Sequence, residues 1–126
     1  MNYFTLDPLE PEVVKKVWGE EHIFRSAETC VKRLVYLEGG KSSLHLHVKK
    51  LEYFLIESGV FTLRYFLPDT GKEVKSELYK GQIILIRPGY SHELYCQDGG
   101  SIIEFSTEDD PSDSYRLNKS VLINKL

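Results

Sequence analysis

The feature that most constrains this fold is a series of short runs rich in β-branched and aromatic residues, separated by Gly- and Pro-containing turns at short, even intervals. The clearest turn is Pro68-Asp69-Thr70-Gly71, in which Pro68 presets φ and Gly71 is free to adopt the left-handed region. Many short strands at this spacing are typical of a β-sandwich or a small jelly-roll barrel. The sequence therefore predicts an all-β fold. The expected strands cover residues 29–38, 53–57, 60–67, 73–79, 83–87, 92–97 and 101–107.

The start of the chain fits two kinds of secondary structure. Asp7 can cap a short helix that begins at Pro8, and valines recur four residues apart at Val13 and Val17. A strand from Val13 to Trp18 is the competing interpretation. We therefore expect either a short N-terminal helix or one more strand.

Size and composition bound the function. A chain of 126 residues with 41% hydrophobic and 28% charged residues is predicted to form one domain over residues 1–126. The net charge of -3 provides no basic surface, which argues against a nucleic-acid partner. No apolar run is long enough to span a bilayer, so no membrane association is expected. Two cysteines, Cys30 and Cys96, are too few for a disulfide framework and indicate a cytoplasmic protein.

Four side chains have the spacing of a metal site. His45 and His47 are two residues apart, so on a strand they face the same side; Glu52 follows, and His92 comes much later in the chain. Imidazole and carboxylate ligands suit a borderline divalent cation, here Zn, Mn, Fe, Ni or Co. Three nitrogens and one oxygen leave a coordination position open, as in catalytic sites. We expect one divalent metal ion at this site.

Glycines around these four residues complete two spaced motifs. They are Gly39-x5-His45-x-His47-x4-Glu52-x6-Gly59 and Gly81-x5-Arg87-x-Gly89-x2-His92. The first resembles the first cupin motif in full. The second resembles the second cupin motif, with Arg87 at the usual proline and Cys96 at the expected asparagine. This resemblance implies a cupin double-stranded β-helix that holds its metal through the four predicted ligands.

A longer stretch, from about residue 18 to residue 116, is similar to the cupin domain of type II phosphomannose isomerases. The similar segments are Trp18-Gly19, Val31-Lys32-Arg33-Leu34, Gly40-x-Ser42-Ser43-Leu44, Glu52-Tyr53-Phe54, Ile103-Glu104-Phe105-Ser106-Thr107 and Asp113-Ser114-Tyr115-Arg116. Those enzymes often carry Gln at the position of His45 and usually carry a fused nucleotidyltransferase domain. The resemblance implies aldose–ketose isomerisation of a sugar or sugar phosphate.

Isomerisation requires proton carriers beside the metal. Glu104, set among Ile102, Ile103 and Phe105, is the first candidate, because a half-buried carboxylate has a raised pKa. The alternative is that Glu104 faces solvent from an edge strand. Tyr53 is a second candidate for catalysis.

A phosphate group on the substrate requires cations. Arg33 and Arg116 lie in the similar segments and are the preferred pair, because two guanidinium groups clamp a phosphate well. Arg87 and Lys50 are further candidates for substrate binding.

Two other functions fit the same ligands. Two histidines and a carboxylate form the facial triad of non-haem iron oxygenases, so a dioxygenase acting on a small molecule is one alternative. A non-catalytic cupin that binds a metal or a sugar is the other. The resemblance also implies a homodimer, in which exposed aromatics could line the contact or cap the end of the barrel. These aromatics are Tyr3, Phe4, Trp18 and Tyr36.

Overall fold

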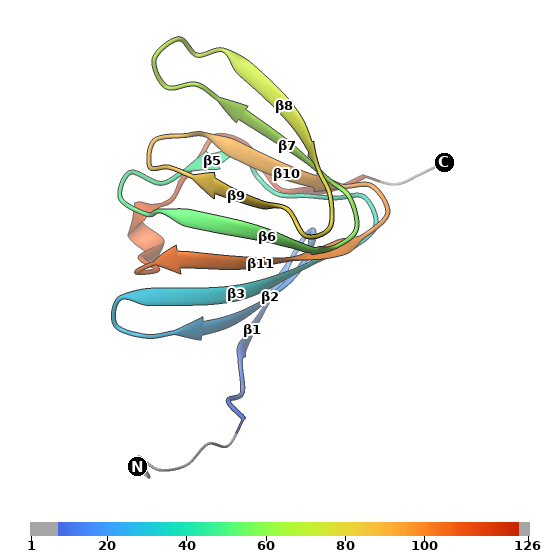
Figure 1. Cartoon of the computed structure of the whole chain (residues 1–126), viewed down its shortest axis with the longest axis vertical. Coiled ribbons are helices and arrows are strands. Elements are labelled where there is room, and N and C mark those ends of the chain that lie inside the picture. The colour runs from blue at the N-terminus through green and yellow to red at the C-terminus, as the bar shows by residue number, and fades with distance from the viewer. Residues whose placement is uncertain (1–7, 124–126) are drawn as a thin grey trace.

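The computed structural model describes residues 8–123, which form two antiparallel β-sheets around one hydrophobic core (Figure 1). The strands of the first sheet are ordered β1-β2-β3-β11-β6-β9. In that order they are β1 (Glu12–Lys16), β2 (Gly19–Arg25), β3 (Thr29–Tyr36), β11 (Gly100–Thr107), β6 (Glu52–Ser58) and β9 (Ile83–Ile86).

The second sheet is built around β10 (His92–Cys96). One side of β10 pairs with β7 (Phe61–Phe66), which in turn pairs with β8 (Glu73–Leu78). The other side pairs with two short strands, β4 (Gly40–Lys41) and β5 (His45–Leu46). The remaining elements are β12 (Tyr115–Arg116) beside β5, β13 (Val121–Leu122) beside β4, and a 3-10 turn η1 (Pro111–Asp113). No helix within residues 8–123 has the length and hydropathy needed to cross a bilayer.

The seven strands predicted from the sequence are all present, with ends shifted by at most two residues. The β7–β8 hairpin turns at the predicted Pro-Asp-Thr-Gly segment, where Gly71 has φ +73° and its N–H donates to the carbonyl of Leu67 at 2.8 Å. The all-β prediction is confirmed.

The short N-terminal helix is wrong for the residues that the structure describes, and the competing strand is correct. β1 pairs along its whole length with β2, so the backbone groups of β1 find partners in a neighbouring strand. Val13 is 51% exposed and Val17 is also exposed, so these two valines, four residues apart, do not form the buried face of a helix. An isolated helix of one or two turns is marginal in water. The proposed cap, Asp7, lies outside the described residues.

Strand alternation fills the core from both sheets. β3 turns Leu34 and Tyr36 inward, and β10 turns Cys96 inward. Trp18 is only 5% exposed and stacks on Tyr36, with the ring centroids 4.2 Å apart. The expectation that these two aromatics are exposed is therefore wrong, because burial against the core outweighs their polar atoms. Tyr3 and Phe4 lie outside the described residues.

Candidate metal centre

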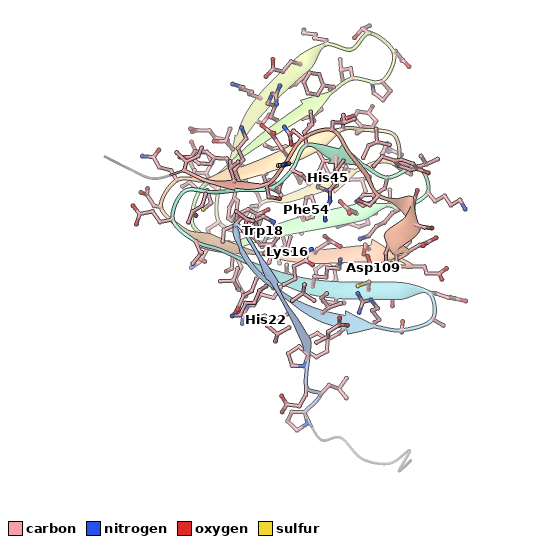
Figure 2. The ribbon with its side chains drawn as sticks, turned by 180° about the vertical axis from the view of Figure 1, so that it is seen from behind. Lys16, Trp18, His22, His45, Phe54 and Asp109 are labelled. Carbon is pink, nitrogen blue, oxygen red and sulfur yellow. The ribbon has the colours of Figure 1, made fainter. Side chains whose placement is uncertain are left out.

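A cavity of about 680 Å³ opens between the two sheets and holds all four predicted ligands. Its apolar lining residues include Trp18, Ile23, Leu34, Phe54 and Leu94, and many of its other lining residues are polar or charged. Figure 2 shows Trp18 and Asp109 on its two sides, with His45 and Phe54 between them. The same inward alternation that fills the core therefore also turns ionisable groups into this space.

The structure brings the four predicted ligands together. His45 on β5 stands directly opposite His92 on β10, with their ring centroids 4.5 Å apart. The ring of His47 lies 5.2 Å from that of His45. Glu52, at the start of β6, reaches both other rings: its Oε1 is 3.0 Å from His47 Nε2, and its Oε2 is 3.4 Å from His92 Nε2. The cluster therefore joins three strands and one loop.

Each imidazole is oriented by a backbone carbonyl. His45 Nδ1 lies 2.8 Å from the oxygen of Ser43, His47 Nδ1 lies 2.7 Å from that of Asp113, and His92 Nδ1 lies 2.9 Å from that of Tyr90. A carbonyl can only accept, so Nδ1 donates in each pair, and the neutral ring carries its lone pair on Nε2. This is how metal-binding imidazoles are commonly held.

The donors fit a divalent metal ion. His92 Nε2 and Glu52 Oε2 are buried and have no hydrogen-bond partner among the described residues. Two ligands each about 2.1 Å from one ion stand roughly 3.0 to 3.4 Å apart at octahedral to tetrahedral angles. The two separations between Glu52 and the imidazoles fall in this range.

The four side chains have not, however, taken up the arrangement of a formed site. No group of three or more His, Cys, Asp or Glu side chains within residues 8–123 has that arrangement. Glu52 instead contacts two of the imidazoles directly, which joins the donors to one another. Metal binding stays a prediction, supported by the unpartnered atoms and their separations.

Burial and neighbouring charges shift the pKa values of His45 and His47 in opposite directions. Burial, aided by His92, lowers the pKa of His45 to about 4. Burial also acts to lower the pKa of His47, but the hydrogen bond and charge of Glu52 outweigh it, so that pKa is raised above 6.5. Burial opposes ionisation of Glu52, yet His47, His92 and Lys50 hold its pKa well below the usual range. Below the raised pKa of His47, the metal-free cluster therefore pairs the ionised Glu52 with a protonated His47.

These shifts predict that metal binding releases a proton from His47. Below its raised pKa His47 keeps the proton, and the ion must displace it; above that pKa the proton has already left. His45, with a pKa of about 4, is already neutral at pH 6, so it releases no proton when the metal binds above that pH. Calorimetric titration of Zn²⁺ at pH 6 and at pH 8 in buffers of different ionisation enthalpy should show a larger proton release at pH 6 than at pH 8. An affinity that does not change between these pH values would contradict the prediction.

A second ionic cluster adjoins the first. Lys50 Nζ lies 3.4 Å from Glu52 Oε1, 3.2 Å from Glu104 Oε2 and 3.1 Å from Asp109 Oδ1. Lys32, directly opposite Glu104 on the neighbouring strand, places its Nζ 3.2 Å from the same Asp109 oxygen. One ammonium group therefore separates the candidate metal ligand Glu52 from Glu104.

The charges of this cluster depend on one another. Burial, with the negative charge of Glu52, raises the pKa of Glu104, as the sequence predicted. Glu104 is 5% exposed, so the alternative that it faces solvent is wrong. Burial acts to lower the pKa of Lys50, but Glu104, Glu52 and Asp109 outweigh it and raise that pKa. Burial opposes ionisation of Asp109, yet Lys32 and Lys50 lower its pKa to about 2.

Two of the predicted substrate residues line the cavity, and two do not. Lys50 and Arg116 are in its wall. Arg33 lies on the outward side of β3 and pairs there with Glu57, with Nη2 and Oε2 2.7 Å apart. Arg87 is exposed beyond the end of β9 and does not line the cavity. The expected pairing of Arg33 with Arg116 is therefore a wrong prediction.

The prediction that Tyr53 is a catalytic residue is also wrong. It follows Glu52 on β6, so strand alternation turns its ring to the outer face, where it is 43% exposed. Sequence reasoning missed two residues of the inner cluster. Lys32 shares the inward parity of Cys30 and Leu34, which is a signal that could have identified it. Asp109 lies in a loop, where no strand alternation indicates which way its side chain points.

Comparison with known proteins supports the fold. No protein-family model and no curated protein matches this chain. Oxalate decarboxylase from Lactobacillus farciminis in its formate complex is similar over 92% of this chain and 38% of its own, with a TM-score of 0.76 and 15% identity. The enzyme from Bacillus subtilis at pH 4.6 is similar over 85% and 30%, with a TM-score of 0.74 and 14% identity. The capsular polysaccharide assembling protein CapF from Staphylococcus aureus is similar over 88% and 33%, with a TM-score of 0.72 and 19% identity.

These likenesses define the class of fold. The chain has the jelly-roll fold of cupins, with two antiparallel sheets and the candidate metal centre between them. It spans 30 to 38% of the length of the three proteins compared. At 14 to 19% identity the similarity establishes the fold alone.

Proposed function

We propose that this protein is a metal-dependent isomerase that interconverts an aldose and a ketose, either as the free sugar or as its phosphate. The observation that carries the proposal is the position of Glu104. Its buried Oε2 has no hydrogen-bond partner among the described residues, and it is separated from the candidate metal ligand Glu52 by the single ammonium group of Lys50. A potential proton carrier therefore adjoins a potential Lewis acid.

Isomerisation moves one proton between neighbouring carbons and a second between their oxygens. A divalent ion held by the four donors would polarise the sugar carbonyl. The Glu104 carboxylate would take the proton from one carbon and return it to the next. Lys50 remains an ammonium because of its three carboxylate neighbours, so it stabilises the ionised form of Glu104 between turnovers.

The cavity suits a small polar substrate. Its volume of about 680 Å³ lies within the range of small-molecule sites. Lys32 and Lys50 are already paired with carboxylates inside it, so an anionic group of the substrate needs other cations. Arg116 and Lys119 are exposed residues in the lining and are our candidates for a phosphate handle.

The deciding experiment combines metal analysis of the purified protein with a screen of aldoses, ketoses and their phosphates. Isomerisation that depends on a divalent metal and consumes no oxygen would support the proposal. Iron together with oxygen consumption on a substrate would identify the dioxygenase alternative instead. Saturable sugar binding with no turnover under any added metal would identify a non-catalytic binding protein.

We further propose a homodimer formed through the outer face of the first sheet. Phe105, Tyr53 and Leu85 are outward neighbours on β11, β6 and β9, all exposed, and Ile83 continues the patch. Contiguous apolar surface of this kind is typical of protein–protein contacts.

We predict that Phe105→Glu converts the dimer to a monomer in analytical ultracentrifugation, because the new charge would be buried at the contact. Val60→Glu, at an exposed apolar residue in the turn after β6, is the control and should leave the dimer intact. The prediction would be contradicted if the wild-type protein remained monomeric across a 100-fold range of protein concentration.

The cytoplasm is the proposed location. Cys30 and Cys96 are free thiols in the structure, and both are buried. Burial raises the pKa of each thiol, which lowers its reactivity.

A further inference from the structure

A buried carboxylate beside the candidate metal centre has no part in the proposed chemistry. Asp113 ends the 3-10 turn η1 in the loop between β11 and β12, and it is buried. Its Oδ1 accepts the backbone N–H of Val48 at 2.9 Å, and its Oδ2 accepts those of Lys49 and Lys50 at 3.0 and 3.1 Å. One side chain therefore satisfies three consecutive backbone donors.

The main chain of Asp113 contacts the same segment a second time. Its carbonyl oxygen accepts from His47 Nδ1 at 2.7 Å. The side chain thus holds the backbone that follows His47, while the carbonyl holds the His47 ring. These contacts connect residues more than 60 positions apart in the sequence.

The segment held in this way has little other support. Residues 47–51 lie between β5 and β6, outside both strands. Besides Asp113, its backbone is bonded to Gly89, whose N–H donates to the His47 carbonyl at 2.7 Å, and to Thr107 near Leu51. The three N–H groups of residues 48–50 form no ladder bonds, so Asp113 determines the course of the corner between the two strands.

Asp113 is itself held independently of the metal centre. Its N–H donates to the carbonyl of Asp110 at 2.9 Å, and the Asp110 side chain caps η1 by accepting from Ser112. In the same loop Asp109 is paired with Lys32 of β3. The loop is therefore anchored to the first sheet, and Asp113 transmits that anchorage to the corner.

We propose that Asp113 is a positioning residue that sets the direction of two functional side chains at once. By fixing the corner it directs His47 Nε2 toward Glu52, and it directs Lys50 Nζ into the gap between Glu52 and Glu104. The proposal rests on the proposed metal site for its functional meaning, but its geometry can be tested in the metal-free protein. A residue that only stabilised the loop would lower the melting temperature without altering His47 in the folded molecules.

The test compares Asp113→Ala with Asp113→Asn and with Asp69→Ala. In metal-free protein, at a pH where the His47 ring is neutral, NMR of the histidine rings reports the His47 tautomer, and hydrogen exchange reports protection of the three amides of residues 48–50. Asp113→Ala should lose that protection and release His47 from its single tautomer. A Co²⁺ titration normalised to folded protein should show a 10- to 100-fold loss of affinity, as for other groups that orient a metal ligand.

Asp113→Asn should recover part of each effect. Its amide oxygen can replace one carboxylate oxygen, but its NH₂ group would face an N–H donor. Asp69→Ala is the control, because it removes an exposed carboxylate from the β7–β8 turn, which does not line the cavity. It should leave the His47 tautomer and the Co²⁺ affinity within threefold of wild type. If Asp113→Ala fails to fold, Asp113→Asn provides the same comparison.

Two outcomes are decisive for the positioning role. A lower melting temperature in Asp113→Ala with an unchanged His47 tautomer and unchanged amide protection would overturn it. Loss of both in the metal-free protein would support it, even if wild-type protein bound no Co²⁺. Absence of Co²⁺ binding by the wild-type protein would refute the proposed metal site, but the positioning of His47 and Lys50 by Asp113 would still be supported.

Discussion

Glu104→Gln is expected to retain the metal and to lose turnover by about 10²- to 10⁴-fold, the range usual for removal of a general acid or base. Glutamine preserves the volume of Glu104 and keeps an oxygen that can face Lys50 Nζ, which lies 3.2 Å from Glu104 Oε2, so the inner face of β11 should keep its packing. It cannot take or return a proton at neutral pH. The effect should therefore appear in kcat, with metal affinity and KM changed by less than about threefold.

The matched control is Glu93→Gln. Glu93 is as buried as Glu104 and also has an unpartnered Oε2, but its Oε1 pairs with Arg64 and Lys41, and it does not line the cavity. The same chemical change there should leave turnover per folded molecule close to wild type. Turnover above a tenth of wild type in Glu104→Gln would remove Glu104 from the proton-carrying role.

The sequence is informative where position along one strand decides direction. His45 and the inward side of β6 follow from alternation over a few residues, whereas His47 lies directly after the end of β5, and the spacing of the cupin-like motif groups Glu52 with the histidines. The hydrophobic neighbours of Glu104 indicate burial for a similar reason. Its partner Lys50 is identifiable as a cation, but its three carboxylate neighbours come from other elements.

Sequence reasoning fails where the residues of a strand do not show which of its two faces is inward, and where distant contacts decide the direction of a side chain. Arg33 and Lys32 are adjacent, and a one-residue difference places one outside with Glu57 and the other inside with Asp109. Tyr53 is misplaced for the same reason. Asp109 and Asp113 lie in an acidic loop whose composition suggests exposure. Ion pairs of Asp109 and hydrogen bonds of Asp113 with residues far away in the sequence nevertheless turn both side chains inward.

Removing a predicted ligand should have the second large effect. His47→Ala and Glu52→Gln are each expected to lower metal affinity by at least about 100-fold, because even groups that only orient a ligand contribute 10- to 100-fold. Glu52 is the more sensitive position, since it contacts two of the three imidazoles. Glutamine keeps its size but removes the charge that attracts the ion.

Two measurements check this expectation. Equilibrium dialysis with Zn²⁺ gives the affinity of each variant, and thermal unfolding shows whether metal still stabilises the fold. At a free metal concentration 100 times Kd, wild-type protein should gain about 2.7 kcal/mol of stability, and the variants should gain almost none at the same concentration. His22→Ala is the control, because that ring bonds to Glu20 and does not line the cavity, so it should behave as wild type. Full metal occupancy in both His47→Ala and Glu52→Gln would refute the ligand assignment, since two independent donors cannot both be dispensable in a site of four.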